Sequence, residues 1–287
     1  MSIDIVIKQK GIIKKKLPLS VIIGKQLHYG EFDGMRLNPG KLGDREFIAY
    51  NPEHIGRGLS IIWNPKERNS IVLRSLTPTN PQEIEDFFNV IKRITDYWKC
   101  NIEVDGNVER SKEFLARLQD MQDFNVQVLK GIFQRIISEE GSSVLLECTM
   151  WPLAVGKEEA QLFIDKPETF FKWMHEKQVI DAYYAKPQFY KKDDEIIGRY
   201  VLTEGARSIF PNQPSVPSNV VDPETNRQLE CNNYEVLFYS STQEKLIGSI
   251  SFDHFIGFIK DKSERFDAHN ILFEGLSLKD IESLIEH

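Results

Sequence analysis

Two aspartate–histidine pairs near the end of the chain form the densest group of residues that could do chemistry. Asp253 precedes His254, and Asp267 stands two residues before His269. Imidazole and carboxylate groups can exchange protons with a substrate or bind a metal ion if the intervening chain folds back. The four residues therefore predict a hydrolase-type enzyme as one alternative. The other is a pair of hydrogen-bonded His–Asp contacts near strand ends.

Four basic residues accompany glycines in the first quarter of the sequence. Arg36, Lys41 and Arg45 lie in the glycine-rich stretch from 29 to 47, and Arg57 stands between Gly56 and Gly58. Flexible glycine backbone beside cations can form an anion site, so an anion- or phosphate-binding module is a second alternative. Long surface loops have the same composition. The two glycines do not begin a G-x-G-x-x-G motif, because the sixth position is an isoleucine and a strand pattern follows.

Other catalytic and metal-binding motifs are incomplete. His175 and Glu176 begin like the H-E-x-x-H zinc motif, but Val179 occupies the place of the second histidine. Neither a G-x-S-x-G nucleophile motif nor a phosphate-binding P-loop occurs in the sequence. We therefore predict no cofactor and no metal, and we leave open whether the protein is an enzyme.

Composition narrows the class of protein. A chain of 287 residues that is 41% hydrophobic can bury a substantial core. Its net charge of −7 disfavours nucleic acid as a partner, because phosphate binding needs a positive field. The three cysteines are far apart and odd in number, which indicates a reducing compartment. Neither a secretory signal nor a run of about 18 apolar residues is present, so we expect a cytoplasmic protein with no membrane partner.

Five lysines cluster near the start of the chain, and they are Lys8, Lys10, Lys14, Lys15 and Lys16. The alternating residues 2–8 predict a half-buried strand, and residues 12–22 are expected to return beside it as a second strand. The lysines would then protect the solvated edge of this hairpin against aggregation. The alternative is contact with an acidic partner or an anionic surface.

Residues 70–104 give the clearest structural pattern, a strand, a capped helix and a second strand. Asn80 can cap the helix, Pro81 suits its first position, and Glu83 has the spacing of a capping box. The apolar residues then repeat with a period of 3.6, and they are Ile84, Phe87, Phe88, Ile91, Ile94 and Trp98. The pattern predicts an amphipathic helix packed on a sheet.

A related pattern occurs twice more. Residues 160–164 are interpreted as a strand before a helix opened by Asp165 and Glu168, and residues 270–276 as one before a helix capped by Ser277 and Asp280. We therefore predict an α+β fold with two lobes, 1–140 and 141–287. Each lobe would hold a mixed, mostly antiparallel sheet with β-β-α-β units covered by amphipathic helices.

Two positions are candidates for contact with a protein partner. Trp151 stands before a proline at a predicted strand end, and exposed tryptophan is enriched at interface hot spots. Pro214 is the middle proline of a P-x-x-P-x-x-P spacing that can form a polyproline II ligand. Because the sequence has long polar loops and no convergent catalytic set, it favours a non-catalytic binding or protein-interaction module. The identity of the partner and the oligomeric state stay open.

The opening residues SIDIVIKQKGIIKKK and the passage NPEHIGRGLSIIW, with its G-R-G-L-S segment at Gly56 to Ser60, carry a resemblance. The chain resembles a functionally uncharacterised family of similar length from Firmicutes, with streptococcal and lactobacillal members. The resemblance covers the whole chain and implies a bacterial, cytoplasmic protein. It implies no activity and no functional residues.

Overall fold

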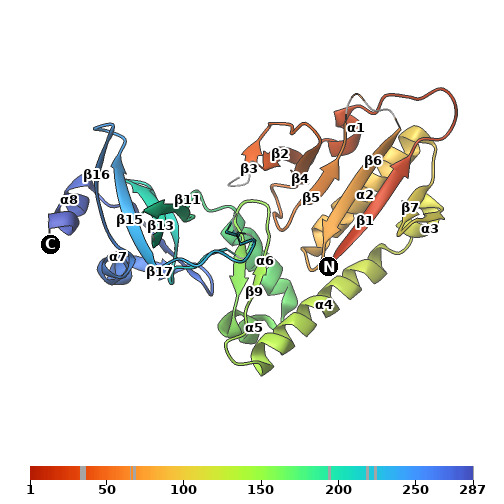
Figure 1. Cartoon of the computed structure of the whole chain (residues 1–287). Coiled ribbons are helices and arrows are strands. Elements are labelled where there is room, and N and C mark those ends of the chain that lie inside the picture. The colour runs from red at the N-terminus through yellow and green to blue at the C-terminus, as the bar shows by residue number, and fades with distance from the viewer. Residues whose placement is uncertain are drawn as a thin grey trace. The chain divides into compact units, whose positions relative to one another are not determined.

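The computed structural model describes residues 1–32, 37–64, 66, 69–192, 195–217, 220–222 and 225–286. The chain divides into two compact units, Met1–Ile180 and Asp181–His287, which are shown in Figure 1. This division lies after helix α6 (Pro167–Gln178) and so differs from the boundary at 140 that the sequence suggests. The reason is that the long helix α4 (Leu118–Ser138) contacts both α2 (Pro81–Trp98) and α6, which ties the segment after 140 to the first unit.

The first unit is built on one eight-stranded sheet. Its strands have the order β3-β2-β4-β5-β6-β1-β7-β8, and each neighbouring pair is antiparallel. In chain order they are β1 (Ser2–Lys8), β2 (His28–Phe32), β3 (Leu37–Pro39), β4 (Glu46–Tyr50), β5 (Leu59–Ile62), β6 (Ser70–Leu76), β7 (Ile102–Val104) and β8 (Asn107–Glu109). Helix α2 connects β6 to β7, and β1 lies between these two strands.

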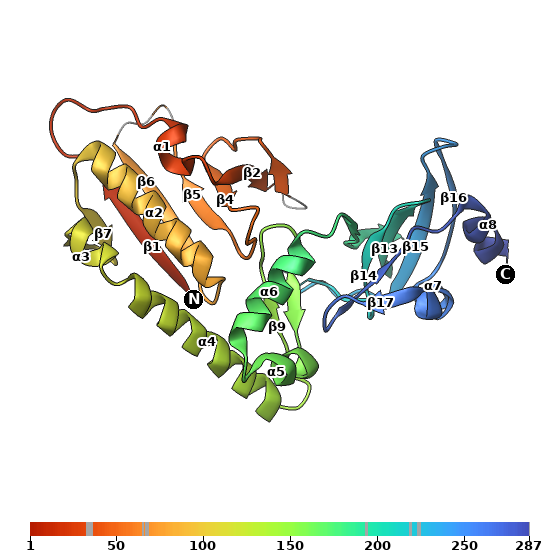
Figure 2. The ribbon, with the colours of Figure 1, turned by 180° about the vertical axis from the view of Figure 1, so that it is seen from behind.

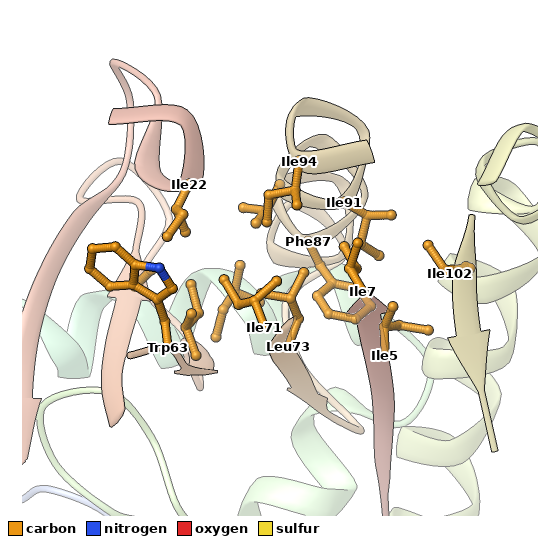
Figure 3. Packing of buried hydrophobic residues seen from close by; sticks show 14 of the residues in the cluster. Ile5, Ile7, Ile22, Trp63, Ile71, Leu73, Phe87, Ile91, Ile94 and Ile102 are labelled. Atoms are coloured by element: carbon orange, nitrogen blue, oxygen red, sulfur yellow. The ribbon is translucent and has the colours of Figure 1, made fainter. Parts of the chain in front are cut away.

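Helix α2 covers one face of this sheet, as the sequence predicts. Figure 3 shows Phe87 and Ile91 of α2 close to Ile5 and Ile7 of β1, and all four side chains are fully buried. Asn80 caps the helix by accepting a hydrogen bond from the backbone N–H of Gln82 at 3.1 Å. The short helix α1 (Leu19–Ile23) adds Ile22 to the same core.

The predicted return strand at residues 12–22 is wrong. Residues 9–18 have no strand, and helix α1 follows them directly after Pro18. The partners of β1 are β6 and β7, which come much later in the chain. The apolar residues Leu17 and Ile22 are buried in the core cluster from a loop and a helix, so their burial does not require strand pairing.

Helices and a small hairpin complete the first unit. They are α3 (Ser111–Leu115), α4, β9 (Val144–Leu146), β10 (Leu153–Val155), α5 (Lys157–Phe163) and α6. Residues 160–164, which the sequence suggests are a strand, mostly belong to α5. Glu159 caps this helix by accepting from the N–H of Gly156 at 3.0 Å. Helix α6 begins at Pro167 without a side-chain cap, so the predicted Asp165–Glu168 capping box does not form.

The second unit holds two four-stranded sheets, β11-β14-β18-β17 and β12-β13-β15-β16. Their strands are β11 (Tyr183–Tyr184), β12 (Gln188–Lys192), β13 (Glu195–Thr203), β14 (Ser208–Pro211), β15 (Asn233–Ser240), β16 (Lys245–Ser251), β17 (Ser263–Arg265) and β18 (Asn270–Phe273). Helices α7 (Phe252–Ile259), with the short 3-10 turn η1 (Lys260–Lys262), and α8 (Leu278–Glu286) accompany them. Aromatic rings fill the core, and Phe210 lies 4.9 Å from Phe255 between ring centroids.

The predicted fold class is confirmed, because the sheets are mixed and mostly antiparallel and helices pack on them. Among the described strands, β11–β14 and β13–β15 are the parallel pairs. The predicted cap of the last helix also forms: the hydroxyl of Ser277 donates to Asp280 at 2.6 Å, and the N–H of Asp280 donates back to that hydroxyl at 3.2 Å. None of the described helices is both long and apolar enough to cross a bilayer.

Candidate ligand-binding site

A buried glutamate holds the loop before β5 against helix α2. Glu83, only 2% exposed, accepts hydrogen bonds from the backbone N–H groups of Gly56 and Gly58 at 2.9 Å each and of Arg57 at 2.8 Å. The hydroxyl of Thr79 donates to the same carboxylate. Burial raises the pKa of Glu83, while these hydrogen bonds lower it by favouring the charged form. Glu83 therefore does not close a capping box with Asn80, as its spacing suggests, but fixes a distant loop.

The two glycines are required by the close approach of this loop to its surroundings. A Cβ atom at Gly56 would lie 2.6 Å from Oε2 of Glu83. Gly58 has a φ of +70°, and a Cβ atom there would lie 2.6 Å from the side chain of Ile48. A larger residue at either position would push the loop away from the carboxylate. The two glycines thus allow the backbone of residues 56–58 to pack against the carboxylate of Glu83.

The same loop orients two histidines. Nε2 of His54 lies 2.7 Å from Oδ2 of Asp86, which stands one turn after Glu83 on α2. The backbone N–H of Ile55 donates to Nδ1 of His175, on α6, at 2.9 Å. Because Nδ1 of His175 accepts this bond, its hydrogen must be on Nε2 when the ring is neutral. Each imidazole is therefore fixed through one nitrogen, which sets its orientation.

Both histidines line an open cavity of about 470 Å³ within the first unit. Helix α6 supplies one wall with residues spaced three and four apart, which lie on one helical face. The full lining consists of Glu53, His54, Asn80, Pro81, Gln82, Gln122, Glu168, Phe171, Lys172 and His175. A cavity of this size is in the range of about 300–1,000 Å³ that is usual for small-molecule sites.

The lining combines charges of both signs with an apolar patch. Glu53 and Glu168 are exposed acids, Lys172 is an exposed base paired loosely with Glu176 at 3.8 Å, and Phe171 is buried. The first turn of α2 also reaches the cavity and brings the partial positive charge of its N-terminus. The cavity can therefore hydrogen-bond a polar molecule at several points. Among the described residues that line it are imidazoles for proton transfer but no serine, threonine or cysteine nucleophile.

Of the basic residues singled out in the sequence, the described ones, Lys41, Arg45 and Arg57, do not line this cavity. Arg36 is outside the described residues. Lys41 pairs with Glu31 at 2.7 Å, and Arg45 is exposed just before β4. Arg57 donates from Nε to the carbonyl of Glu147 at 2.8 Å, and burial lowers its pKa. The described members of the group bond within the first unit or face solvent.

The two aspartate–histidine pairs have different surroundings. Asp253 and His254 lie exposed in the first turn of α7, where Ser251 caps the helix. Asp267 is buried, and its carboxylate accepts from the N–H groups of His269 and Asn270 at 2.8 Å each, which fixes the turn before β18. No set of three or more His, Cys, Asp or Glu side chains in the described part of the chain is placed to hold a metal ion.

The two candidate partner contacts are partly exposed. Nε1 of Trp151 donates to the carbonyl of Ile180 at 3.2 Å, and its backbone N–H donates to the buried side chain of Gln178 at 3.1 Å. Pro214 lies half-buried in the irregular segment after β14. These contacts anchor Trp151 at the end of the first unit, and they do not reveal a partner.

Sequence patterns did not identify His54 or Asp86 as members of a site. Asp86 falls on the face of α2 that the periodicity assigns to solvent, yet the loop before β5 covers it and leaves it 7% exposed. The sequence indicated His175 only as the first residue of an incomplete H-E-x-x-H zinc motif. A possible signal was the pair of acids, Glu83 and Asp86, one turn apart at the start of a helix that is otherwise firmly packed.

The chain matches a family model described as Domain of unknown function (DUF4299) over residues 2–284, and it belongs to that family. No curated protein and no solved structure matches it.

Proposed function

We propose that this member of the DUF4299 family is a non-catalytic binding module whose ligand is an amino acid or a short peptide held in the cavity between α2, α6 and the loop before β5. One observation carries the proposal: two imidazoles that line the cavity are each fixed through one nitrogen, to Asp86 and to the amide of Ile55. Fixed rings reduce the ordering cost of binding, because their rotamers are set before the ligand arrives.

The chemistry of the lining supports this class of ligand. Lys172 can pair with a carboxylate, and Glu53 or Glu168 can pair with an ammonium group. Nε2 of a neutral His175 offers a donor for a carbonyl oxygen. Phe171 supplies apolar area for a short aliphatic side chain. A zwitterionic or amide-containing molecule satisfies these groups together, whereas a simple anion would meet two carboxylates.

The test is a binding screen with amino acids and dipeptides, followed by ligand-detected NMR and calorimetry. We expect at least one of these probes to bind, and Lys172→Ala and Glu168→Ala each to weaken its binding tenfold or more, since a charged hydrogen bond contributes about 1.5–3 kcal/mol. Lys130→Ala is the matched control, because Lys130 is an exposed base of α4 that does not line the cavity. The bound probe should be recovered chemically unchanged. Absence of binding by every probe, or equal loss in the control, would remove the proposal.

A hydrolase is the second candidate, and the His54–Asp86 hydrogen bond of 2.7 Å favours it. A carboxylate that orients an imidazole is the arrangement of a general base, which could activate a water molecule. If the screened dipeptides are cleaved, and Asp86→Asn abolishes the cleavage while binding persists, the protein is an enzyme. The Asp253/His254/Asp267/His269 region supports a hydrolase less well, because the carboxylate of Asp267 is already occupied by two backbone N–H groups.

An anion- or phosphate-binding function of Lys41, Arg45 and Arg57 has less support than the cavity, since Lys41 pairs with Glu31 and Arg57 bonds to carbonyl groups.

We also propose that the protein is located in the cytoplasm of a Firmicutes bacterium. The three cysteines are thiols outside any disulfide, which fits a reducing compartment. Fractionation of such a cell with an antibody to the chain would test this location.

A further inference from the structure

The segment between β1 and α1 presents two apolar side chains directly to water. Ile12 is fully exposed and Ile13 is 92% exposed, whereas Ile5 and Ile7 of the adjacent β1 are buried. Figures 1 and 2 show this segment as a loop that arches outside the sheet in both views. Exposing two neighbouring isoleucine side chains to water is energetically unfavourable. Burying them against the surface of a partner would therefore be favourable.

The base of this loop is firmly built. The buried side chain of Gln9 donates to the carbonyl of Lys15 at 2.9 Å and accepts from the N–H of the same residue at 2.6 Å. Nε1 of Trp98, on α2, donates to that carbonyl at 3.0 Å. These bonds close the loop at Gln9 and Lys15 and anchor it to the core helix. The residues between them, which we call the docking tip (residues 10–14), are held out from the unit.

Lysines surround the docking tip, and residues 8–18 contain no acid. Lys8 pairs with Glu103 at 2.6 Å, and Nζ of Lys15 lies 3.8 Å from the centre of the Tyr97 ring. Lys10 and Lys16 are exposed, and Lys14 is partly buried and donates to the carbonyl of Gln9. The loop is thus strongly positive on a chain whose net charge is −7.

We propose that the docking tip binds the surface of an anionic lipid bilayer, with Ile12 and Ile13 in the interface and the lysines at the phosphate groups. A bilayer suits a convex tip, since lipids adapt to a protruding loop, whereas a protein partner would need a matching pocket. Apolar residues flanked by lysines are the usual composition of interfacial anchors. The contact is at the surface and needs no spanning helix. It revises the expectation of no membrane partner, which rests on the absence of a long apolar run.

The rest of the molecule limits this contact to a weak and reversible one. A net negative protein is repelled by an anionic surface, so the docking tip must supply the attraction. A lysine near such a surface contributes about a fivefold increase in affinity, which falls as salt screens it. The loop is therefore expected to bind in low salt and to release as the ionic strength rises.

The test is co-sedimentation of the full chain with phosphatidylcholine vesicles that contain phosphatidylglycerol, compared with phosphatidylcholine alone. We expect binding to the anionic vesicles, little binding to the neutral ones, and a loss of tenfold or more in the double variant Ile12→Ser and Ile13→Ser. The pair Lys10→Gln and Lys16→Gln should weaken binding by a similar factor. Leu162→Ser is the matched control, because Leu162 is 70% exposed on α5 beside acids, and it should bind like the parent protein.

Several results would overturn the proposal. These are no sedimentation with anionic vesicles at low salt, equal binding to neutral vesicles, or unchanged binding of the double serine variant. If light scattering instead shows self-association that the serine variant loses, the docking tip is an interface between copies of the chain. Because both isoleucines are exposed, the variants should fold, which unchanged tryptophan fluorescence would verify. The outcome is independent of the cavity, whose lining contains no residue of this loop.

Discussion

The buried carboxylate of Glu83 accepts a hydrogen bond from the backbone N–H of Gly58 at 2.9 Å, across 25 positions of the chain. The same oxygen accepts from Gly56, and the other oxygen accepts from Arg57. One side chain at the start of α2 thereby sets the position of the loop before β5. That loop carries His54 and Ile55, so the geometry of the cavity depends on Glu83 without Glu83 lining it.

Removal of this carboxylate should destabilise the first unit. In Glu83→Ala three backbone N–H groups lose their acceptor, and each buried unsatisfied group costs about 1–3 kcal/mol. We expect a loss of about 3 kcal/mol or more in urea unfolding followed by tryptophan fluorescence, since all four tryptophans lie in the first unit. Glu85→Ala, an exposed acid on the same helix, should stay within about 0.5 kcal/mol of the parent. A loss below about 1 kcal/mol in Glu83→Ala would show that water replaces the carboxylate.

The glycine at the same contact can be tested against a glycine with a similar backbone. Gly58 and Gly106 have φ values of +70° and +79°, but a Cβ atom meets Ile48 and Thr149 at Gly58 and nothing within 4 Å at Gly106. Alanine at either position carries the strain of a left-handed backbone, so the difference between the variants isolates the lack of space. We expect Gly58→Ala to lose about 1–3 kcal/mol more than Gly106→Ala in the same unfolding measurement. Equal losses would mean that the loop shifts freely.

The core between α2 and the sheet should respond strongly to truncation. Phe87 is fully buried, and Figure 3 shows its ring beside β1. Phe87→Ala should cost about 3–5 kcal/mol, because a cavity forms where the ring was removed. Ile62→Ala is the comparison, since Ile62 is 42% exposed at the end of β5 and should cost less than about 1 kcal/mol. A small loss of stability in Phe87→Ala would contradict the packing of α2 on the sheet through this ring.

The second unit offers a test by pH. Glu204 accepts from the backbone N–H of Thr242 at 2.9 Å, and this bond, together with the hydroxyl of Ser240, lowers its pKa from 4.5 to about 2. Because the folded pKa is depressed, the stabilisation is fully present above pH 4.5 and is lost as the pH falls toward 2. The amide shift of Thr242, followed by NMR, should titrate with a midpoint near 2. Glu204→Gln should abolish the step, and a midpoint near 4.5 in the parent would exclude the bond in solution.

Much of the fold follows from local patterns. The stripe from Ile84 to Trp98 predicts α2 because a period of 3.6 has few other structural solutions at that length. The cap of α8 at Ser277 is likewise local, since its partner Asp280 is three residues away. The predicted strand at residues 160–164 is wrong, because a short apolar run fits a strand and a buried helix equally well.

The candidate site depends on contacts between residues that are far apart in the sequence, and no local sequence pattern predicts such contacts. Residue types and spacing determined the α+β class, the capped helix on a sheet and the lysine-rich character of residues 8–16. Only the tertiary structure decided that Glu83 binds residues 56–58, that His54 and His175 meet one cavity, and that Ile12 and Ile13 face water. The physical reason is distance along the chain: caps and helical periodicity act over three to seven residues, whereas the bond from Ile55 to His175 joins residues 120 positions apart. Such a contact forms only after the sheet and both helices have packed.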